Sequence, residues 1–219
     1  VVRESKKGET IKTLNGKDYI LPDALTVITD SSSILAIGGI IGGVESGCTE
    51  TTSDIFLEVA LFEPTSVALA GRTLQIDSDA RYRFERGVDV AFVEEAAKRA
   101  VAMIIELCGG QASELVIAGK TPDWKREIAF NPQRVKSLGG VDIAPEKSLE
   151  ILGKLGFSVI RHPSSVICTP PSWRADIEGE ADLVEEILRI YGYENIPATP
   201  LPKPTNITPA ILNTSQKRI

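Results

Sequence analysis

Six carboxylates lie between Asp176 and Glu186, and they are the densest group of side chains in this chain that could do chemistry. They are Asp176, Glu178, Glu180, Asp182, Glu185 and Glu186. Oxygen ligands of this kind suit a hard cation such as magnesium. A metal ion, a basic partner or solvent alone could neutralise so much negative charge, and the residue types leave these three alternatives open.

A helix predicted from about Glu180 to Tyr191 would place apolar residues on one face and acids on the opposite face. At about 100° per residue, the apolar face carries Leu183, Val184, Ile187, Leu188 and Tyr191. The opposite face carries Asp182, Glu185, Glu186 and Arg189. Asp176 precedes this helix by about one turn and a short link, so four acids could cooperate as a magnesium site. The alternative is a solvated acidic face, which the helix dipole favours near an N-terminus.

A glycine-rich passage and one carboxylate form a second candidate site. Glycines at positions 38, 39, 42 and 43 let the backbone approach a ligand or another strand closely. The passage lacks the pattern of a dinucleotide fingerprint or a P-loop. Glu58 lies in the apolar run Ile55–Ala60, which predicts a buried strand, and a buried carboxylate needs a partner. That partner could be an amine or hydroxyl of a ligand, or a structural hydrogen bond or ion pair.

Composition excludes several classes of protein. The net charge of −6 and the pI near 5.0 argue against broad electrostatic binding to nucleic acid. No apolar run reaches the roughly 18–20 residues that cross a bilayer. The cysteines Cys48, Cys108 and Cys168 have no paired spacing, which is typical of reduced thiols in a cytoplasmic protein. The only histidine, His162, is expected at the surface, and a zinc site is not expected.

The elements that must position these residues can be predicted from turns and periodicity. Asn15-Gly16 predicts a tight hairpin, and the polar turn Asp30–Ser33 predicts another between two apolar runs. A long helix is predicted from about Asp89 to the stop at Gly109-Gly110. Charges of both signs between Arg72 and Asp89 indicate an ion-pair network leading into it.

The second half reads as short helices and a strand. A composition break falls near Lys120–Asp123. Asn131-Pro132 and Ala144-Pro145 each predict a helix start. Val166–Cys168 predicts a strand, and the proline-rich stretch from Pro197 to Pro209 predicts a linker. The chain also begins without Met and as if within a strand, which suggests an excised piece.

Several motifs, in order along most of the chain, resemble the β subunit of bacterial phenylalanyl–tRNA synthetase. They are Ala36–Gly43, the LExAxF-like run Phe56–Phe62, Asp79-Ala80 with Arg83–Asp89, Leu155–Phe157, Pro171–Ile177 and Glu185–Tyr193. No single motif would identify the family, and their common order carries the resemblance.

The resemblance implies an α+β fold with two domains. Residues 1–121 would form a mixed sheet-and-helix editing domain, the B3/B4 domain, lacking its N-terminal part. Residues 122–198 would form the B5 domain, a small α/β module with a DNA-binding-like fold. Residues 199–219 would be a linker toward a catalytic-like module.

The resemblance also implies site residues and partners. The editing pocket would be lined by Gly39, Gly42, Glu58, Ser78 and Ala80, with Glu58 sensing the hydroxyl of a mischarged tyrosine. A magnesium ion shared with an α subunit would be held by Asp176, Asp182, Glu185 and Glu186. The whole cytoplasmic enzyme would contain two α and two β subunits, bind tRNA and use ATP at a site outside this chain.

Departures from the family pattern bear on activity. The family usually has threonine at Ser78, alanine at Gly38 and methionine at Ile41. The editing histidine of the family would precede Val1, and His162 lies in the other module. No catalytic residue is therefore expected in these 219 residues, and the chain alone is expected to edit poorly or not at all.

Overall fold

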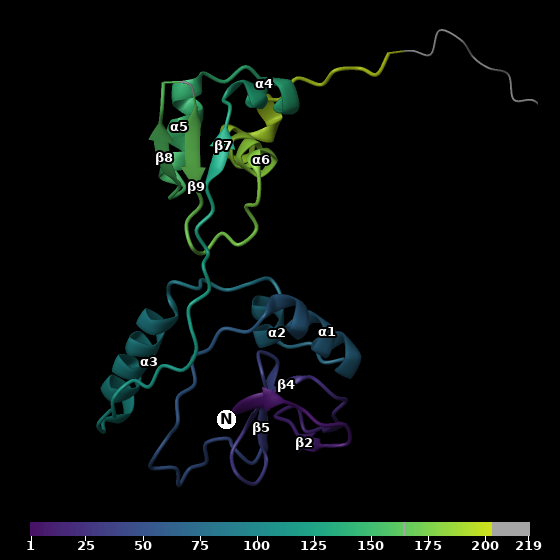
Figure 1. Cartoon of the computed structure of the whole chain (residues 1–219), viewed down its shortest axis with the longest axis vertical. Helices are drawn as coiled ribbons and strands as arrows, with labels where there is room; N and C mark the ends of the chain where they lie inside the picture. Colours follow the sequence, from purple (N-terminus) through teal and green to yellow (C-terminus); the bar gives the residue numbers. More distant parts are fainter. Residues whose placement is uncertain (164, 203–219) are drawn as a thin grey trace, which may run out of the picture.

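The computed structural model describes residues 1–163 and 165–202, and it combines helices with small antiparallel sheets. The predicted α+β class is confirmed at this level (Figure 1). The part of the predicted linker beyond residue 202 lies outside the described residues. Among the residues described, no helix is both long and apolar enough to cross a membrane.

A four-stranded sheet of order β1-β4-β5-β6 forms the first structural unit. Its strands are β1 (Val2–Glu4), β4 (Thr26–Thr29), β5 (Ile34–Ile37) and β6 (Ile41–Gly42). The predicted β4–β5 hairpin is confirmed, and the Asp30 carboxylate accepts hydrogen bonds from the backbone N–H groups of Ser32 and Ser33. This turn leads the chain directly into the glycine passage.

A separate hairpin pairs β2 (Thr10–Lys12) with β3 (Asp18–Ile20). The turn between them contains Gly16 at a φ of +79°, which confirms the prediction from Asn15-Gly16. Two helices cover the sheet: α1 (Pro64–Leu74) and α2 (Asp79–Phe84). The core between sheet and helices consists of Ile11, Leu21, Val27, Ile37, Ile40, Val67, Ala70 and Ile76.

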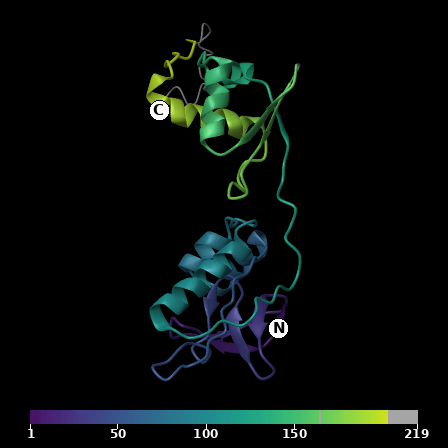
Figure 2. The same cartoon turned by 90° about the vertical axis from the view of Figure 1, so that its left-hand side faces the viewer.

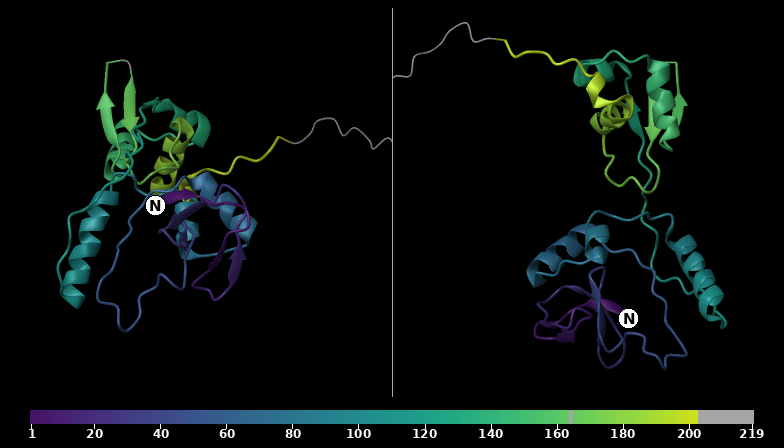
Figure 3. Two further views of the ribbon diagram at one scale, coloured as in Figure 1. Left: turned by 60° about the horizontal axis from the view of Figure 1, so that its bottom comes forward. Right: turned by 180° about the vertical axis from the view of Figure 1, so that it is seen from behind.

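The long helix α3 (Val93–Cys108) ends at Gly109 as predicted but begins after the predicted Asp89. Asp89 instead accepts a hydrogen bond from the N–H of Ala91 in the preceding turn. Only Ala97 of α3 is buried, and both views of Figure 3 draw the helix apart from α1 and α2. Periodicity therefore predicted the helix correctly without predicting how much of its apolar face is buried.

The prediction of a buried strand at Ile55–Ala60 is wrong for this structure. The segment has no regular secondary structure, and Phe56 is 92% exposed. A strand needs backbone partners on a neighbouring strand, and no registered strand pair of the described residues includes this segment. The apolar pattern was compatible with a strand, but pattern alone supplies no hydrogen-bond partner.

The second structural unit packs three helices against the sheet β7-β9-β8 (Figure 2). Its elements are β7 (Ile128–Phe130), α4 (Gln133–Gly139), α5 (Pro145–Lys154), β8 (Ser158–Arg161), β9 (Val166–Thr169), α6 (Glu180–Tyr191) and a 3-10 turn at Tyr193–Asn195. The predicted helices and the β9 strand are confirmed. Asn131 accepts a hydrogen bond from the N–H of Gln133, which is how it helps to start α4.

The core of this unit confirms the apolar face predicted for α6. Leu183, Val184, Ile187 and Leu188 are buried there, whereas Tyr191 is partly exposed. Cys168 lies in the same core, and burial raises the pKa of its thiol to about 11. Cys48 and Cys108 are exposed in contrast to Cys168, and His162 is exposed as predicted.

Candidate functional site

The acidic cluster is built from the loop before α6 and from α6 itself. Arg174 in that loop extends its guanidinium between Asp176 and Glu186. Its Nε and Nη2 donate to the two carboxylate oxygens of Asp176 at 2.8 and 2.6 Å. Its Nη1 donates to Oε2 of Glu186 at 2.6 Å. One arginine thus joins two acids that lie ten positions apart in the sequence (176 and 186).

A second arginine completes the contacts of Glu186. Nε and Nη2 of Arg189, one turn along α6, donate to Oε1 and Oε2 of Glu186 at 2.8 and 2.6 Å. Hydrogen bonds from Arg189 lower the pKa of Glu186 to about 2, with Arg174 acting in the same direction and burial acting against both. The hydrogen bonds from Arg174 also lower the pKa of Asp176. Both carboxylates are therefore ionised and already neutralised near neutral pH.

The placement of Glu186 corrects the sequence prediction. It was expected on the solvent face with Asp182 and Glu185, but its side chain is only 6% exposed. The reason is that Arg174 and Arg189 supply two charged donors, and an ion-paired carboxylate can be buried at an acceptable cost. The sequence contained one local signal for this, the i,i+3 spacing of Glu186 and Arg189. It contained no signal for the contact across the loop.

Asp182 and Glu185, the other two predicted magnesium ligands, do not take part in the ion pairs of Arg174 and Arg189. Asp182 accepts hydrogen bonds from the N–H groups of Glu178 and Gly179 at 2.9 and 2.8 Å, and so satisfies orphan donors at the start of α6. Glu185 is exposed. Glu180, which was not predicted to take part, pairs with Arg134 on α4.

This geometry does not fit a magnesium site within the chain. Both oxygens of Asp176 and both of Glu186 accept hydrogen bonds from arginine, and one oxygen of Asp182 accepts from the backbone. Across residues 1–163 and 165–202, no three or more His, Cys, Asp or Glu side chains are grouped so that they could hold a metal ion. The four predicted ligands stay a prediction, and nothing in this structure brings them together around one point.

Two of the predicted pocket residues lie near one another. Ser78 caps α2, accepting a hydrogen bond from the N–H of Arg81, and its hydroxyl donates to the carbonyl of Ile40 at 2.6 Å. Gly39, the residue before Ile40, faces Phe62 and Val67 so closely that an added Cβ would lie 2.9 Å from the Phe62 ring. Ala80 follows in the first turn of α2.

The predicted pocket is filled rather than open in this structure. Beside Gly38, a cavity of only about 10 Å³ remains between Phe62 and α1, less than a water molecule comfortably occupies. Gly42 faces Leu14. Glu58 lies on the irregular segment and is exposed, although nearby protein atoms partly desolvate its carboxyl and raise its pKa.

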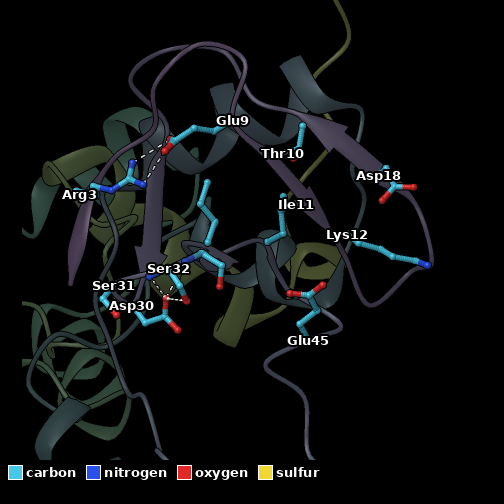
Figure 4. A pocket seen from close by; sticks show the side chains of 13 residues that line it. Arg3, Glu9, Thr10, Ile11, Lys12, Asp18, Asp30, Ser31, Ser32 and Glu45 are labelled. Carbon is cyan, nitrogen blue, oxygen red and sulfur yellow. Dashed lines mark hydrogen bonds and ion pairs between the residues drawn. The ribbon is translucent and has the colours of Figure 1, made fainter.

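Another hollow lies in the first unit and contains none of the predicted site residues. It has a volume of about 580 Å³ and is lined by residues of β1, β2, the β4–β5 turn and the segment near Glu45 (Figure 4). Its wall carries the ion pair of Arg3 with Glu9 at 2.7 Å, which lowers the pKa of Glu9 to about 2. Its charged groups are thus partly satisfied by one another.

Comparison with known proteins places both structural units in described families. Residues 1–109 match the B3/4 domain, and residues 128–193 match the tRNA synthetase B5 domain. The phenylalanine–tRNA ligase beta subunit of Paramagnetospirillum magneticum is 51% identical over 216 residues, covering 99% of this chain and 27% of that protein.

Other relatives agree with this match. The beta subunit of Rhodospirillum rubrum is 45% identical over 218 residues, covering 99% of this chain and 27% of its own length. That of Novosphingobium aromaticivorans is 44% identical over 203 residues, covering 93% and 25%. The chain therefore spans about a quarter of the length of the curated relatives it matches.

Proposed function

Since this chain belongs to the family of phenylalanine–tRNA ligase β subunits, we propose that it serves the ATP-dependent charging of the phenylalanine tRNA as part of that ligase. The observation that carries the proposal is the 51% identity that runs through both structural units, over 99% of the chain. Its partners would be an α subunit, in an assembly of two α and two β subunits, and tRNA. The aminoacylation site and the ATP would belong to other parts of this cytoplasmic enzyme.

The two structural units would have different roles in the ligase. We assign hydrolytic editing of mischarged tyrosine to residues 1–121, and assembly to the B5 module at residues 122–198, whose fold would be of the DNA-binding kind. Residues 199–219 would lead on toward the catalytic-like module. The hydrogen bond from Ser78 to the carbonyl of Ile40 brings the start of α2 next to Gly39, which supports assigning these predicted editing residues to one place in the fold. Because Phe62 fills that space, the chain alone is expected to hydrolyse tyrosyl-tRNA slowly or not at all.

Replacing Glu58 with glutamine in the complete ligase is expected to slow hydrolysis of tyrosyl-tRNA by roughly tenfold or more. A hydrogen bond to a charged group contributes about 1.5–3 kcal/mol, and the substitution would remove the charge that receives the tyrosine hydroxyl. The measurement is the deacylation rate of preformed tyrosyl-tRNA carrying the phenylalanine anticodon. The control is Glu50→Gln, an exposed carboxylate nearby. Equal deacylation rates for the two variants would show that Glu58 is not part of the editing site.

Association with an α subunit can be tested at α6. Glu185 is the acid whose replacement disturbs the fold least, because it is exposed while Glu186 is buried and Asp182 caps the helix. We expect Glu185→Ala to raise the dissociation constant of the complex with the α subunit by about tenfold. Glu185 is one of the four proposed ligands of the shared magnesium ion, and weakening the support of a metal site costs about 10–100-fold in metal affinity.

The matched control for this experiment is Glu146→Ala, an exposed acid on α5. Both variants are co-expressed with the α subunit, and the dissociation constant is measured by analytical ultracentrifugation. Unchanged affinity for Glu185→Ala would place the subunit contact elsewhere. Failure of the wild-type chain to retain the α subunit would count against the assembly role itself.

A further inference from the structure

We propose that Arg174 is the built-in cation of the acidic cluster, and that it excludes a divalent metal ion from Asp176 and Glu186 in this chain by itself. The inference takes from the proposed function only the set of four acids. It concerns the isolated chain rather than the assembled ligase. Four side chains carry the inference: Arg174 in the loop, Asp176, and Glu186 and Arg189 on α6.

Arg174 already occupies carboxylate oxygens of Asp176 and Glu186. The three nitrogens of the Arg174 guanidinium each donate to a carboxylate oxygen, two to Asp176 and one to Glu186, at 2.6–2.8 Å. Charge-assisted and forked contacts of this length are the strong class of hydrogen bond. Magnesium needs oxygen ligands at about 2.0–2.1 Å in near-ideal octahedral geometry. The two kinds of contact therefore compete for the same atoms.

The positive charges of Arg174 and Arg189 balance the negative charges of Asp176 and Glu186. Asp176 and Glu186 together carry two negative charges, and Arg174 and Arg189 carry two positive charges within 2.6–2.8 Å of them. These four side chains are thus neutral together without any ion, with Glu186 buried and the Asp176 side chain 62% exposed. A divalent cation at the same oxygens would lie a few ångströms from a guanidinium, and the repulsion between these like charges would be strongest at the buried oxygens of Glu186. Metal and Arg174 cannot hold the two acids together at once.

Hydrogen bonds to the loop backbone and to the side chain hold Arg174 in place. The Arg174 N–H donates to the carbonyl of Pro171 at 3.0 Å, which closes a turn. Arg126 donates to the carbonyls of Arg174 and Ala175 at 3.5 and 3.2 Å. The Arg174 side chain is 21% exposed, and its partner Glu186 is almost fully buried. The guanidinium is held in place from both backbone and side chain, so displacing it is costly.

The experiment measures Mn²⁺ binding to the full 219-residue chain by electron paramagnetic resonance, with Mn²⁺ as the probe for a hard divalent cation. The wild-type chain is expected to bind Mn²⁺ weakly, and Arg174→Met is expected to bind it at least tenfold more tightly. The matched control is Arg134→Met, which removes an arginine paired with Glu180 on the same helix. Its affinity for Mn²⁺ should equal that of the wild type.

Three results would overturn the inference. Equal, tight binding by the wild type and Arg174→Met would show that Arg174 does not compete, and it would leave the magnesium site of the proposed function standing. Absence of binding in both would show that removing Arg174 does not release a site, while the co-purification experiment would still decide the role in assembly. If Arg174→Met loses the wild-type circular dichroism spectrum, Arg174→Gln replaces it. Glutamine removes the charge but keeps a polar side chain that can donate a hydrogen bond, and unchanged affinity in that variant overturns the inference as well.

Discussion

Replacing Ile187 with alanine is expected to lower the free energy of unfolding of the second structural unit by about 2–5 kcal/mol. Ile187 lies in the middle of α6 with 0% of its surface exposed, inside a core shared with β7, β9, α4 and α5. Truncation removes buried methyl groups and leaves a cavity that rigid neighbours cannot close. Urea unfolding followed by far-UV circular dichroism measures the change.

Ile190 provides a control of the same residue type on the same helix. It is 49% exposed, so Ile190→Ala should change the free energy of unfolding by no more than about 0.5 kcal/mol. Equal losses for the two variants would mean that burial on α6 is not what stabilises this unit. The helix would then contribute through its propensity alone, since both substitutions change that propensity in the same way.

Replacing Gly39 with alanine is expected to lower the free energy of unfolding of the first unit by about 2–5 kcal/mol in total. Gly39 has a φ of +69°, which costs an alanine about 1–2 kcal/mol. The new Cβ would also lie 2.9 Å from Phe62 and 3.0 Å from Val67. Phe62 cannot easily move aside, because its ring packs edge-to-face on Phe84 at a centroid distance of 5.1 Å.

Gly16→Ala separates the two causes of this loss. Gly16 has a φ of +79° but nothing within 4 Å of an added Cβ. It should therefore lose only the backbone contribution of about 1–2 kcal/mol. Thermal or urea unfolding of the two variants side by side gives the difference. If Gly39→Ala were no more destabilised than Gly16→Ala, the glycine passage would have room beside it, as an open pocket at Gly39 would require.

Local elements of this fold followed directly from the amino-acid sequence. The hairpin at Gly16, the Asp30 turn and the helix α6 each depend on interactions within a few residues. A glycine at positive φ, an aspartate accepting from its own turn and an apolar stripe at helical spacing behave alike in most surroundings. Such features need no knowledge of distant residues.

Features that need a distant partner could not be predicted in this way. The run Ile55–Ala60 has the residues of a strand but pairs with no strand among the described residues, and Phe56 is exposed. Glu186 has the helical position of a solvent-facing acid, yet it is buried because Arg174 reaches it from the preceding loop. Whether such a residue or segment finds its partner depends on which distant segments folding brings together.

Motifs in order along the sequence identified the family resemblance and the order of the two units, and helical spacing singled out four candidate acids near α6. None of these requires knowledge of the folded chain. Folding established what those acids contact: Arg174 and Arg189 neutralise Asp176 and Glu186, and the backbone uses Asp182. A carboxylate binds whichever cation folding brings within about 3 Å of it, and spacing along a chain does not specify that cation.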